Sequence, residues 1–276
     1  MEANVLVDLL KQEMNKKNRL IFLAMAVFLV IVTILMAVIG KDTRTLDGYK
    51  LMNTFGGITP VIELLATIIT ATRFAGVDSN KQVRQNMENH SKTTIFFSKV
   101  ITCMVGYFIL LALSVLTIIF MKYLVFPESA FAGKLALELQ WATLGNIAYV
   151  FIFESFVIMV IGFCKTWYGS IAFGVALNYI TELIAGIFMI FIYNNRQLIW
   201  NPFNFFFVEK QIQDGMKHMM TRLTLNQIIA GSIVYAGIFF VIGFIIFVFI
   251  RKFKTDDELI AKRQAKKNKK QKLQTA

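Results

Sequence analysis

Residues 20–39 read LIFLAMAVFLVIVTILMAVI, a run of twenty residues without a charged side chain. The hydrocarbon core of a bilayer is about 30 Å thick, and an α-helix needs about 20 apolar residues to cross it. A helix also satisfies its own backbone hydrogen bonds, as a segment surrounded by lipid must. The run therefore predicts a transmembrane helix and indicates the fold class of the chain around it.

The composition of the whole chain is that of a membrane protein. Of its 276 residues, 57% are hydrophobic and 17% are charged, whereas soluble domains average about 45–50% apolar and about 25% charged residues. This balance excludes disordered, collagen-like and disulfide-stabilised proteins and most soluble enzymes. Cys103 and Cys164 lie in apolar stretches and form neither a disulfide framework nor a CxxC metal motif.

Five further apolar stretches are long enough to cross a bilayer. We therefore predict an all-α polytopic membrane protein whose six transmembrane helices occupy residues 20–250. Thr59 and Pro60 suit the N-cap and the first helical position of the second span. The six predicted spans are 20–39, 58–74, 95–120, 144–164, 168–193 and 228–250.

Positive charge indicates the orientation of these spans. The chain has 29 Lys and Arg against 17 Asp and Glu, and Lys and Arg are enriched in cytoplasmic loops. If both termini are inside, 20 of the 29 cations lie on the inner side and nine on the outer side. We therefore expect both termini in the cytoplasm. The basic tail, residues 251–276, is expected to lie on anionic lipid rather than on nucleic acid.

Residues 1–19 predict an amphipathic helix in the inner interface ahead of the first span. A cleavable signal peptide is not expected, because no small-residue cleavage site ends the apolar run. A frayed basic leader is the alternative interpretation. Within 3–17, one face carries Leu6, Leu9, Leu10 and Met14, and the opposite face carries Asp8, Lys11, Gln12 and Asn15.

The connection between the second and third spans, residues 76–92, is the most informative polar segment. Ser79 with Gln82 three residues later fits a capping box, which predicts a short helix over about 80–88. Ser91 can then cap the third span. A short, capped helix of mixed charge on the inner side suits a docking element, although an ordinary solvated loop has a similar composition.

The segment 194–226 is too apolar for a free outer loop, since residues 200–207 read WNPFNFFF. We expect it to re-enter the outer half of the membrane as one or two short helices. Such a re-entrant segment is allowed only where protein buries the turn.

The sequence lacks the common catalytic motifs. It contains no GxxxxGK[ST] phosphate-binding loop, no HExxH and no GxSxG. The two histidines, His90 and His218, are predicted on opposite sides of the membrane. No catalytic residue, cofactor or metal ligand is assigned to this chain, and a self-contained enzyme is not expected.

Acidic side chains inside the predicted spans are the main candidates for a substrate path. A charged residue at mid-bilayer costs about 2.5–3.5 kcal/mol on insertion scales, so it should face protein, water or a partner. The alternative is that hydrogen-bonded glutamates simply join helices. The candidate path residues are Glu63, Thr67, Glu154, Asn178 and Glu182.

The order of these parts resembles the ABC-2 type permeases of ABC transporters, especially bacterial permeases for bacitracin-like, lantibiotic or other toxic-peptide efflux. That family has an amphipathic cytoplasmic helix, six spans, a coupling helix between spans two and three, and re-entrant helices before span six. The family's usual Gly-Thr in the coupling segment is Asn80-Lys81 here. The stretches that carry the resemblance are 81–91, 93–99, 201–203 and 251–256.

The resemblance implies a bacterial plasma-membrane exporter in which two permease chains, identical or different, face each other. Each chain would dock a separate ABC ATPase, which binds ATP and Mg, and an amphipathic peptide or lipid-like cargo would pass between the chains. A non-transporting immunity or scaffold protein that binds a toxin or partner is the alternative. The implied ATPase-coupling residues are Ser79, Lys81, Gln82, Arg84, Glu88 and Ser91.

Overall fold

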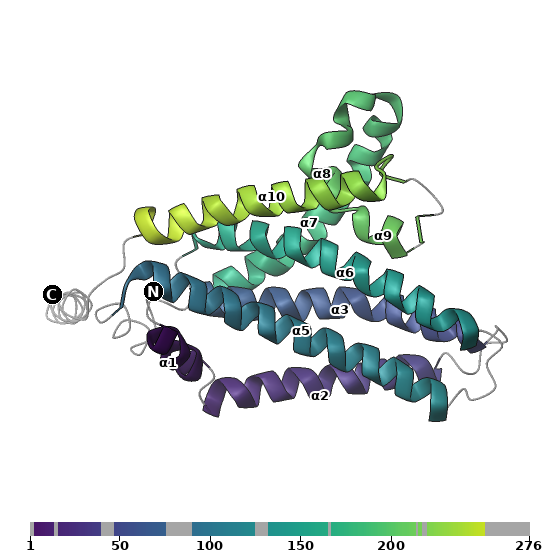
Figure 1. The fold of residues 1–276 in the computed structure, drawn as a ribbon, viewed down its shortest axis with the longest axis horizontal. Coiled ribbons are helices and arrows are strands. Elements are labelled where there is room, and N and C mark those ends of the chain that lie inside the picture. Colours follow the sequence, from purple (N-terminus) through teal and green to yellow (C-terminus); the bar gives the residue numbers. More distant parts are fainter. Residues whose placement is uncertain are drawn as a thin grey trace, which may run out of the picture.

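The computed structural model describes a bundle of helices (Figure 1). Six helices are long and apolar enough to cross a membrane, and no strand occurs in the described ranges. The prediction of an all-helical, multi-pass membrane protein is therefore confirmed. The described residues are 3–13, 16–39, 47–75, 90–124, 132–164, 167–213, 215–216 and 220–251.

The six long helices follow the predicted spans but extend beyond several of them. The predicted coupling helix over 80–88 and the tail after Arg251 lie outside the described residues. The long helices are α2 (Lys16–Ile39), α3 (Asp47–Ala75), α5 (Lys92–Leu124), α6 (Ala132–Ile161), α7 (Trp167–Asn194) and α10 (Leu225–Ile245). The shorter elements are α1 (Ala3–Glu13), η3 (Arg196–Trp200), α8 (Pro202–Phe205), α9 (Val208–Gln213) and the π-helical turn η4 (Ile246–Ile250) that continues α10.

Pro60 lies inside α3, so the prediction that Thr59 and Pro60 start this helix is wrong. Proline has no N–H, and inside a helix it leaves the carbonyl four residues earlier without its usual donor. Here that carbonyl belongs to Gly56, and Thr59 Oγ1 donates to it at 3.1 Å. The hydroxyl replaces the missing backbone donor, which explains how α3 continues back to Asp47.

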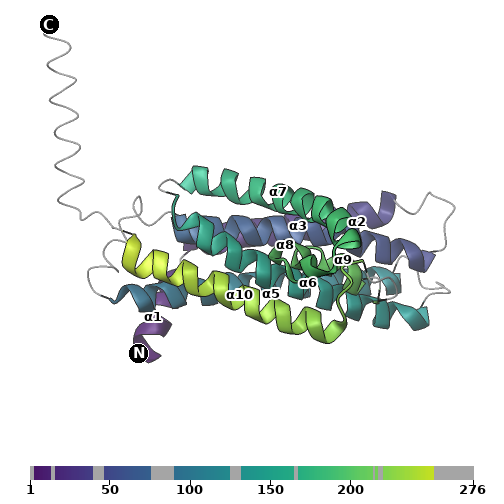
Figure 2. The same ribbon diagram turned by 90° about the horizontal axis from the view of Figure 1, so that it is seen from above.

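α3 and α6 form the centre of the bundle. They pack against each other, with α2, α5 and α7 on α3 and with α7 and α10 on α6 (Figures 1 and 2). The outer helices α2 and α10 turn apolar side chains outward, as expected of surfaces that face lipid. Among these side chains, Leu20, Leu23, Ile233 and Val234 are each more than half exposed.

The segment before α10 is packed onto the bundle rather than left as a loop. Phe206, at the end of α8, is buried and lies 5.6 Å from the Phe156 ring of α6 and 6.5 Å from the Phe239 ring of α10, centroid to centroid. α9 lies against α6. Two buried amides hold the segment together: Asn204 donates to the Thr221 carbonyl at 2.9 Å, and Gln211 donates to the Leu223 carbonyl at 2.8 Å. The bundle therefore buries Phe205 and Phe206 of the aromatic run.

Small residues let helices approach each other within this chain. A Cβ on Gly174 of α7 would lie 2.9 Å from Thr67 Cγ2 of α3. A Cβ on Gly243 of α10 would lie 3.1 Å from the backbone nitrogen of Met159 on α6. Gly237, two turns earlier on α10, has no atom within 4 Å of the same position.

The two α10 glycines provide a matched test of this packing. Replacing Gly243 by Leu should lower the free energy of unfolding by about 1–3 kcal/mol, because α6 backbone atoms cannot move aside and overpacking costs that much. Gly237→Leu should leave stability unchanged or raise it slightly, since leucine favours the helix more than glycine. Thermal unfolding of the two variants in the same detergent measures the difference, and equal midpoints would contradict the packing described.

Candidate functional site

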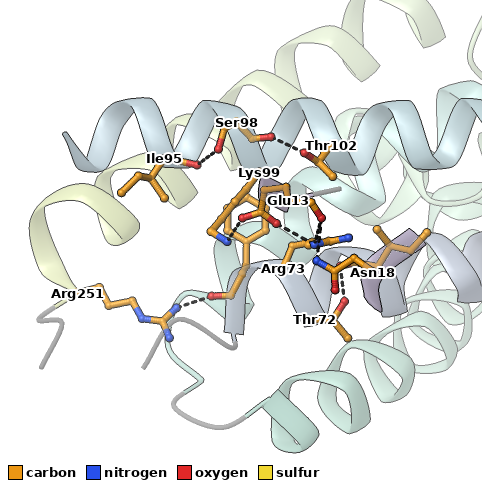
Figure 3. Close-up of polar contacts among 11 residues, drawn as sticks. Glu13, Asn18, Thr72, Arg73, Ile95, Ser98, Lys99, Thr102 and Arg251 are labelled. Atoms are coloured by element: carbon orange, nitrogen blue, oxygen red, sulfur yellow. Dashed lines mark hydrogen bonds and ion pairs between the residues drawn. The ribbon is translucent and has the colours of Figure 1, made fainter. Parts of the chain in front are cut away.

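A buried ion-pair network holds the end of α1 against α3 and α5. Glu13, the last residue of α1, accepts hydrogen bonds from Arg73 Nη1 of α3 at 2.8 Å and from Lys99 Nζ of α5 at 2.9 Å. The side chains of Lys99, Glu13 and Arg73 are only 2%, 12% and 14% exposed. Figure 3 shows both cations converging on the Glu13 carboxylate. We call these three residues the Glu13 clamp.

The C-terminus of α1 explains why two cations gather there. The last carbonyls of a helix lack intrahelical donors, and the helix dipole makes this end negative. The Glu13 carbonyl accepts from Arg73 Nη1 at 2.9 Å and from Asn18 Nδ2 at 2.8 Å. Its carboxylate adds a full charge at the same place, so backbone and side chain attract Arg73 together.

Other cations bind helix ends at the same end of the bundle, which we call the α1 end. Arg251, just after η4, donates to the Phe74 carbonyl of α3 at 2.9 Å and to the Cys164 carbonyl after α6 at 3.3 Å. Lys92 of α5 donates to the Val248 carbonyl of η4 at 3.2 Å. Cations near helix C-termini are favourable, and these contacts fasten α3, α5, α6 and α10 to one another.

The Glu13 carboxyl is ionised because of these partners. Burial alone raises the pKa of a carboxyl, but the charges of Lys99 and Arg73, and their hydrogen bonds, outweigh it. The pKa of Glu13 therefore lies below its ordinary value of 4.5. A paired, ionised Glu13 is the state in which α1 stays attached.

The Glu13 clamp binds a cation on each of the two helices that flank the segment in which the coupling residues are predicted. Arg73 lies in the last turn of α3 and Lys99 lies two turns into α5, so Glu13 contacts the two helices that residues 76–89 connect in the sequence. Ser91 Oγ accepts from the Thr94 N–H at 3.2 Å and caps α5 as predicted. The other predicted coupling residues, Ser79, Lys81, Gln82, Arg84 and Glu88, lie outside the described residues.

A stripe of polar side chains on α3 forms a second candidate site inside the bundle. Its members are three or four residues apart and therefore share one helix face. They are at most 2% exposed, and their contacts with α6 and α7 place that face at the centre of the bundle. The residues of this polar stripe are Thr59, Glu63, Thr67 and Thr70.

Three of the five predicted path residues meet along the stripe. Thr67 Oγ1 donates to Glu154 Oε1 of α6 at 3.0 Å, and Thr70 lies beside the same carboxyl. Glu63, one turn before Thr67, accepts from Asn146 Nδ2 of α6 at 3.0 Å. These bonds join α3 to α6, as the helix-joining interpretation requires, and they also form a polar layer in an apolar bundle.

The two path residues on α7 are placed differently. Asn178 is buried, and its Nδ2 has no hydrogen-bond partner in the described part of the chain. Glu182, one turn later, is half-buried and close enough to Glu63 for their charges to interact. α7 therefore adds an unsatisfied amide and a third carboxyl to the surroundings of the polar stripe.

Sequence reasoning missed Glu13, Asn146 and Glu209. Asn146 lies inside a predicted span and follows Gly145, a position that allows close approach of another element. Glu209 lies in the segment expected to re-enter the membrane, so the rule for intramembrane acids could have selected it. No sequence pattern pairs Glu13 with cations 60 and 86 residues away.

Replacing Glu13 by Gln tests the clamp. The change leaves Arg73 and Lys99 buried without a counter-charge, which costs up to about 3–5 kcal/mol. Undocking of α1 limits the loss, because it lets water reach the cations. Asp8→Asn is the matched control, since Asp8 pairs with Lys11 only at an exposed site, where an ion pair contributes little. Thermal unfolding should show a lower midpoint for Glu13→Gln alone; equal effects would contradict the clamp.

The same pair of proteins should differ less in acid. Because the folded pKa of Glu13 is lowered, its stabilisation is complete above the ordinary value of 4.5 and is lost as the pH falls through the folded value. The midpoint difference between wild type and Glu13→Gln should therefore be constant near neutral pH and shrink below about pH 4. A difference that grows in acid would show that the clamp carboxylate is not ionised.

Comparison with known proteins assigns no family to the chain. No protein-family model matches it, and no curated protein is similar to it.

Proposed function

We propose that this chain is the membrane permease subunit of a bacterial ABC exporter that works as a dimer. ATP would be hydrolysed by separate partner subunits, with Mg. The observation that carries the proposal is the Glu13 clamp, because it joins α1 to α3 and α5, the two helices that the predicted docking segment connects. The resemblance of the order of parts to ABC-2 type permeases supports the same function.

The clamp offers a way for a partner on residues 76–89 to move the bundle. A push on this segment acts on the ends of α3 and α5, and Glu13 binds a cation from each of them. The buried pairs resist separation, since breaking one leaves an uncompensated charge. We therefore expect α1, α3 and α5 to move together when the segment moves.

α3 would carry this movement to the polar stripe. Thr67 is six residues from Arg73, about 9 Å along the helix axis, and it donates to Glu154 of α6. A shift of α3 would change this contact and the Glu63–Asn146 contact one turn further on. The candidate path residues Glu63, Thr67, Glu154, Asn178 and Glu182 would then respond to events at the α1 end.

The cargo proposed is an amphipathic or hydrophobic molecule, in the first instance a peptide. The apolar side chains exposed on the outer surface of the bundle suit a cargo that is itself partly apolar. The proposed orientation places the α1 end in the cytoplasm of a bacterial cell, with the cargo moving outward between two chains.

Capture of the partner is the decisive experiment for the proposal. The tagged full-length chain is purified from its native membranes in mild detergent, and the co-purifying proteins are identified. A P-loop ATPase in a stoichiometric amount supports the permease function. Its absence, under conditions in which a known ABC complex stays intact, would overturn the proposal and favour the immunity or scaffold function.

Substitution of the docking segment tests coupling within such a complex. Arg84→Ala with Glu88→Ala should reduce stimulation of ATP hydrolysis by the permease, and resistance of cells to amphipathic peptides, because the predicted docking helix loses its charged contacts. Lys11→Ala, on the exposed Asp8–Lys11 pair, is the control and should change neither. Unchanged ATPase stimulation and unchanged resistance in the double variant would contradict the coupling role.

A further inference from the structure

Two buried carboxyl groups meet where α9 packs on the bundle. Glu63 of α3 and Glu209 of α9 are 1% and 7% exposed, and a single amide nitrogen, Asn146 Nδ2, contacts Oε1 of both carboxyl groups. Glu63 Oε2 has no donor in the described part of the chain. A contact between two carboxylates contains only acceptors, so a hydrogen bond between them needs a proton.

Amide groups hold this pair from two sides. Asn146 Nδ2 of α6 donates to Glu63 Oε1 at 3.0 Å and lies 3.4 Å from Glu209 Oε1. Gln213 Nε2 donates to Glu209 Oε1 at 2.6 Å, and the Tyr107 hydroxyl of α5 donates to Asn146 Oδ1 at 2.8 Å. The amides present N–H groups to the carboxyls, whereas a bound metal ion would require oxygen ligands.

The remaining titratable groups around the pair do not supply a positive charge. Tyr107 of α5, Tyr149 of α6 and Glu182 of α7 interact electrostatically with the pair. Thr181 lies near the Tyr149 hydroxyl, which still has no partner of good hydrogen-bond geometry among the described residues. In the described part of the chain, no Lys or Arg forms an ion pair with Glu63 or Glu209, and Lys210 lies over the Phe207 ring.

Repulsion between their negative charges opposes ionisation of both buried carboxyl groups at once. Two carboxyl groups that share a site cannot both ionise easily, and one of them then keeps its proton. Repulsion between two carboxylates therefore favours keeping one proton near neutral pH, and so does the lack of a donor for Glu63 Oε2.

We propose that Glu63 and Glu209 form a proton-binding site that takes a single proton between them, and that this proton holds α9 against α3 and α6. Gly145 of α6 permits the close approach, since a Cβ there would lie 2.9 Å from the Glu209 carbonyl oxygen. Loss of the proton leaves two carboxylates in contact, and their repulsion releases α9. The stabilisation is complete while the pair holds its proton and is lost as the pH rises and the proton leaves. This proposal does not depend on an ATPase partner.

Infrared spectra of the purified full-length protein test whether the pair holds one proton. Wild type at neutral pH should show a carboxylic-acid C=O band that Glu63→Gln and Glu209→Gln each remove completely, because the surviving carboxyl ionises beside amide donors. The double variant should lose no more of the intensity of this band than either single variant loses. A band that persists in one single variant, a half-loss in each, or no change in any variant would overturn the shared proton.

Hydrogen exchange of residues 208–213 tests whether the proton holds α9. After correction for intrinsic exchange rates, wild type should lose protection in this segment as the pH rises. Glu63→Gln should keep it, because the glutamine N–H replaces the proton as a permanent donor. Glu138→Gln on α6 is the matched control and should behave as wild type.

Two results of this exchange experiment would overturn the proposal. One is protection that does not change with pH in wild type. The other is protection that increases with sodium chloride, but not with potassium chloride, at constant pH; a sodium ion would then occupy the pair instead of a proton. Wild type alone gives both readouts, so the test stands even if a variant does not fold.

Discussion

Polar groups buried in a membrane protein must find partners inside it, and this constraint decides how α3 is placed. α3 carries polar side chains at Thr59, Glu63, Thr67 and Thr70 on one face, and lipid can satisfy none of them. The bundle turns this face toward α6, where Asn146 and Glu154 accept or supply the hydrogen bonds. The rotation of both central helices follows from these pairs, and the apolar faces of α2, α5, α7 and α10 are then free to contact helices and lipid.

The same constraint acts at the α1 end with full charges. Arg73 and Lys99 are buried, and Glu13 gives both of them a counter-charge. An amphipathic helix could lie anywhere along a membrane interface, but these pairs locate the end of α1 between α3 and α5. Arg251 and Lys92 bind helix carbonyls nearby, so positive charge also joins the helices at the α1 end.

The sequence was sufficient for features that depend on local composition. Twenty or so apolar residues predict a membrane-crossing helix whatever surrounds them, and the six long helices lie where the apolar runs are. The aromatic run at 200–207 indicated a packed segment for the same reason, because free loops do not expose so much apolar surface. Serine before an apolar run was enough to predict the cap at Ser91. Pro60 misled the prediction, since its place inside α3 depends on a hydroxyl bond to Gly56 that propensity rules do not include.

The candidate sites were only partly predictable. Glu63, Thr67 and Glu154 could be selected because acids and polar residues are costly in a membrane, but nothing in the sequence indicated that Thr67 would meet Glu154. Asn146 and Glu209 come from separate elements, and they join Glu63 only because α9 folds back on Gly145. The pairing of Glu13 was harder still to predict, since the two cations that bind it lie 60 and 86 residues further along the chain.

The sequence by itself determined that this is an all-helical protein with six membrane-length helices, because the hydrophobic effect acts on each segment through its own composition. Only the tertiary structure decided which buried charges and hydrogen-bonding groups are partners. The reason is physical: a hydrogen bond or ion pair acts over about 3 Å, and the separation of two residues along the chain does not reveal which helix faces will come that close.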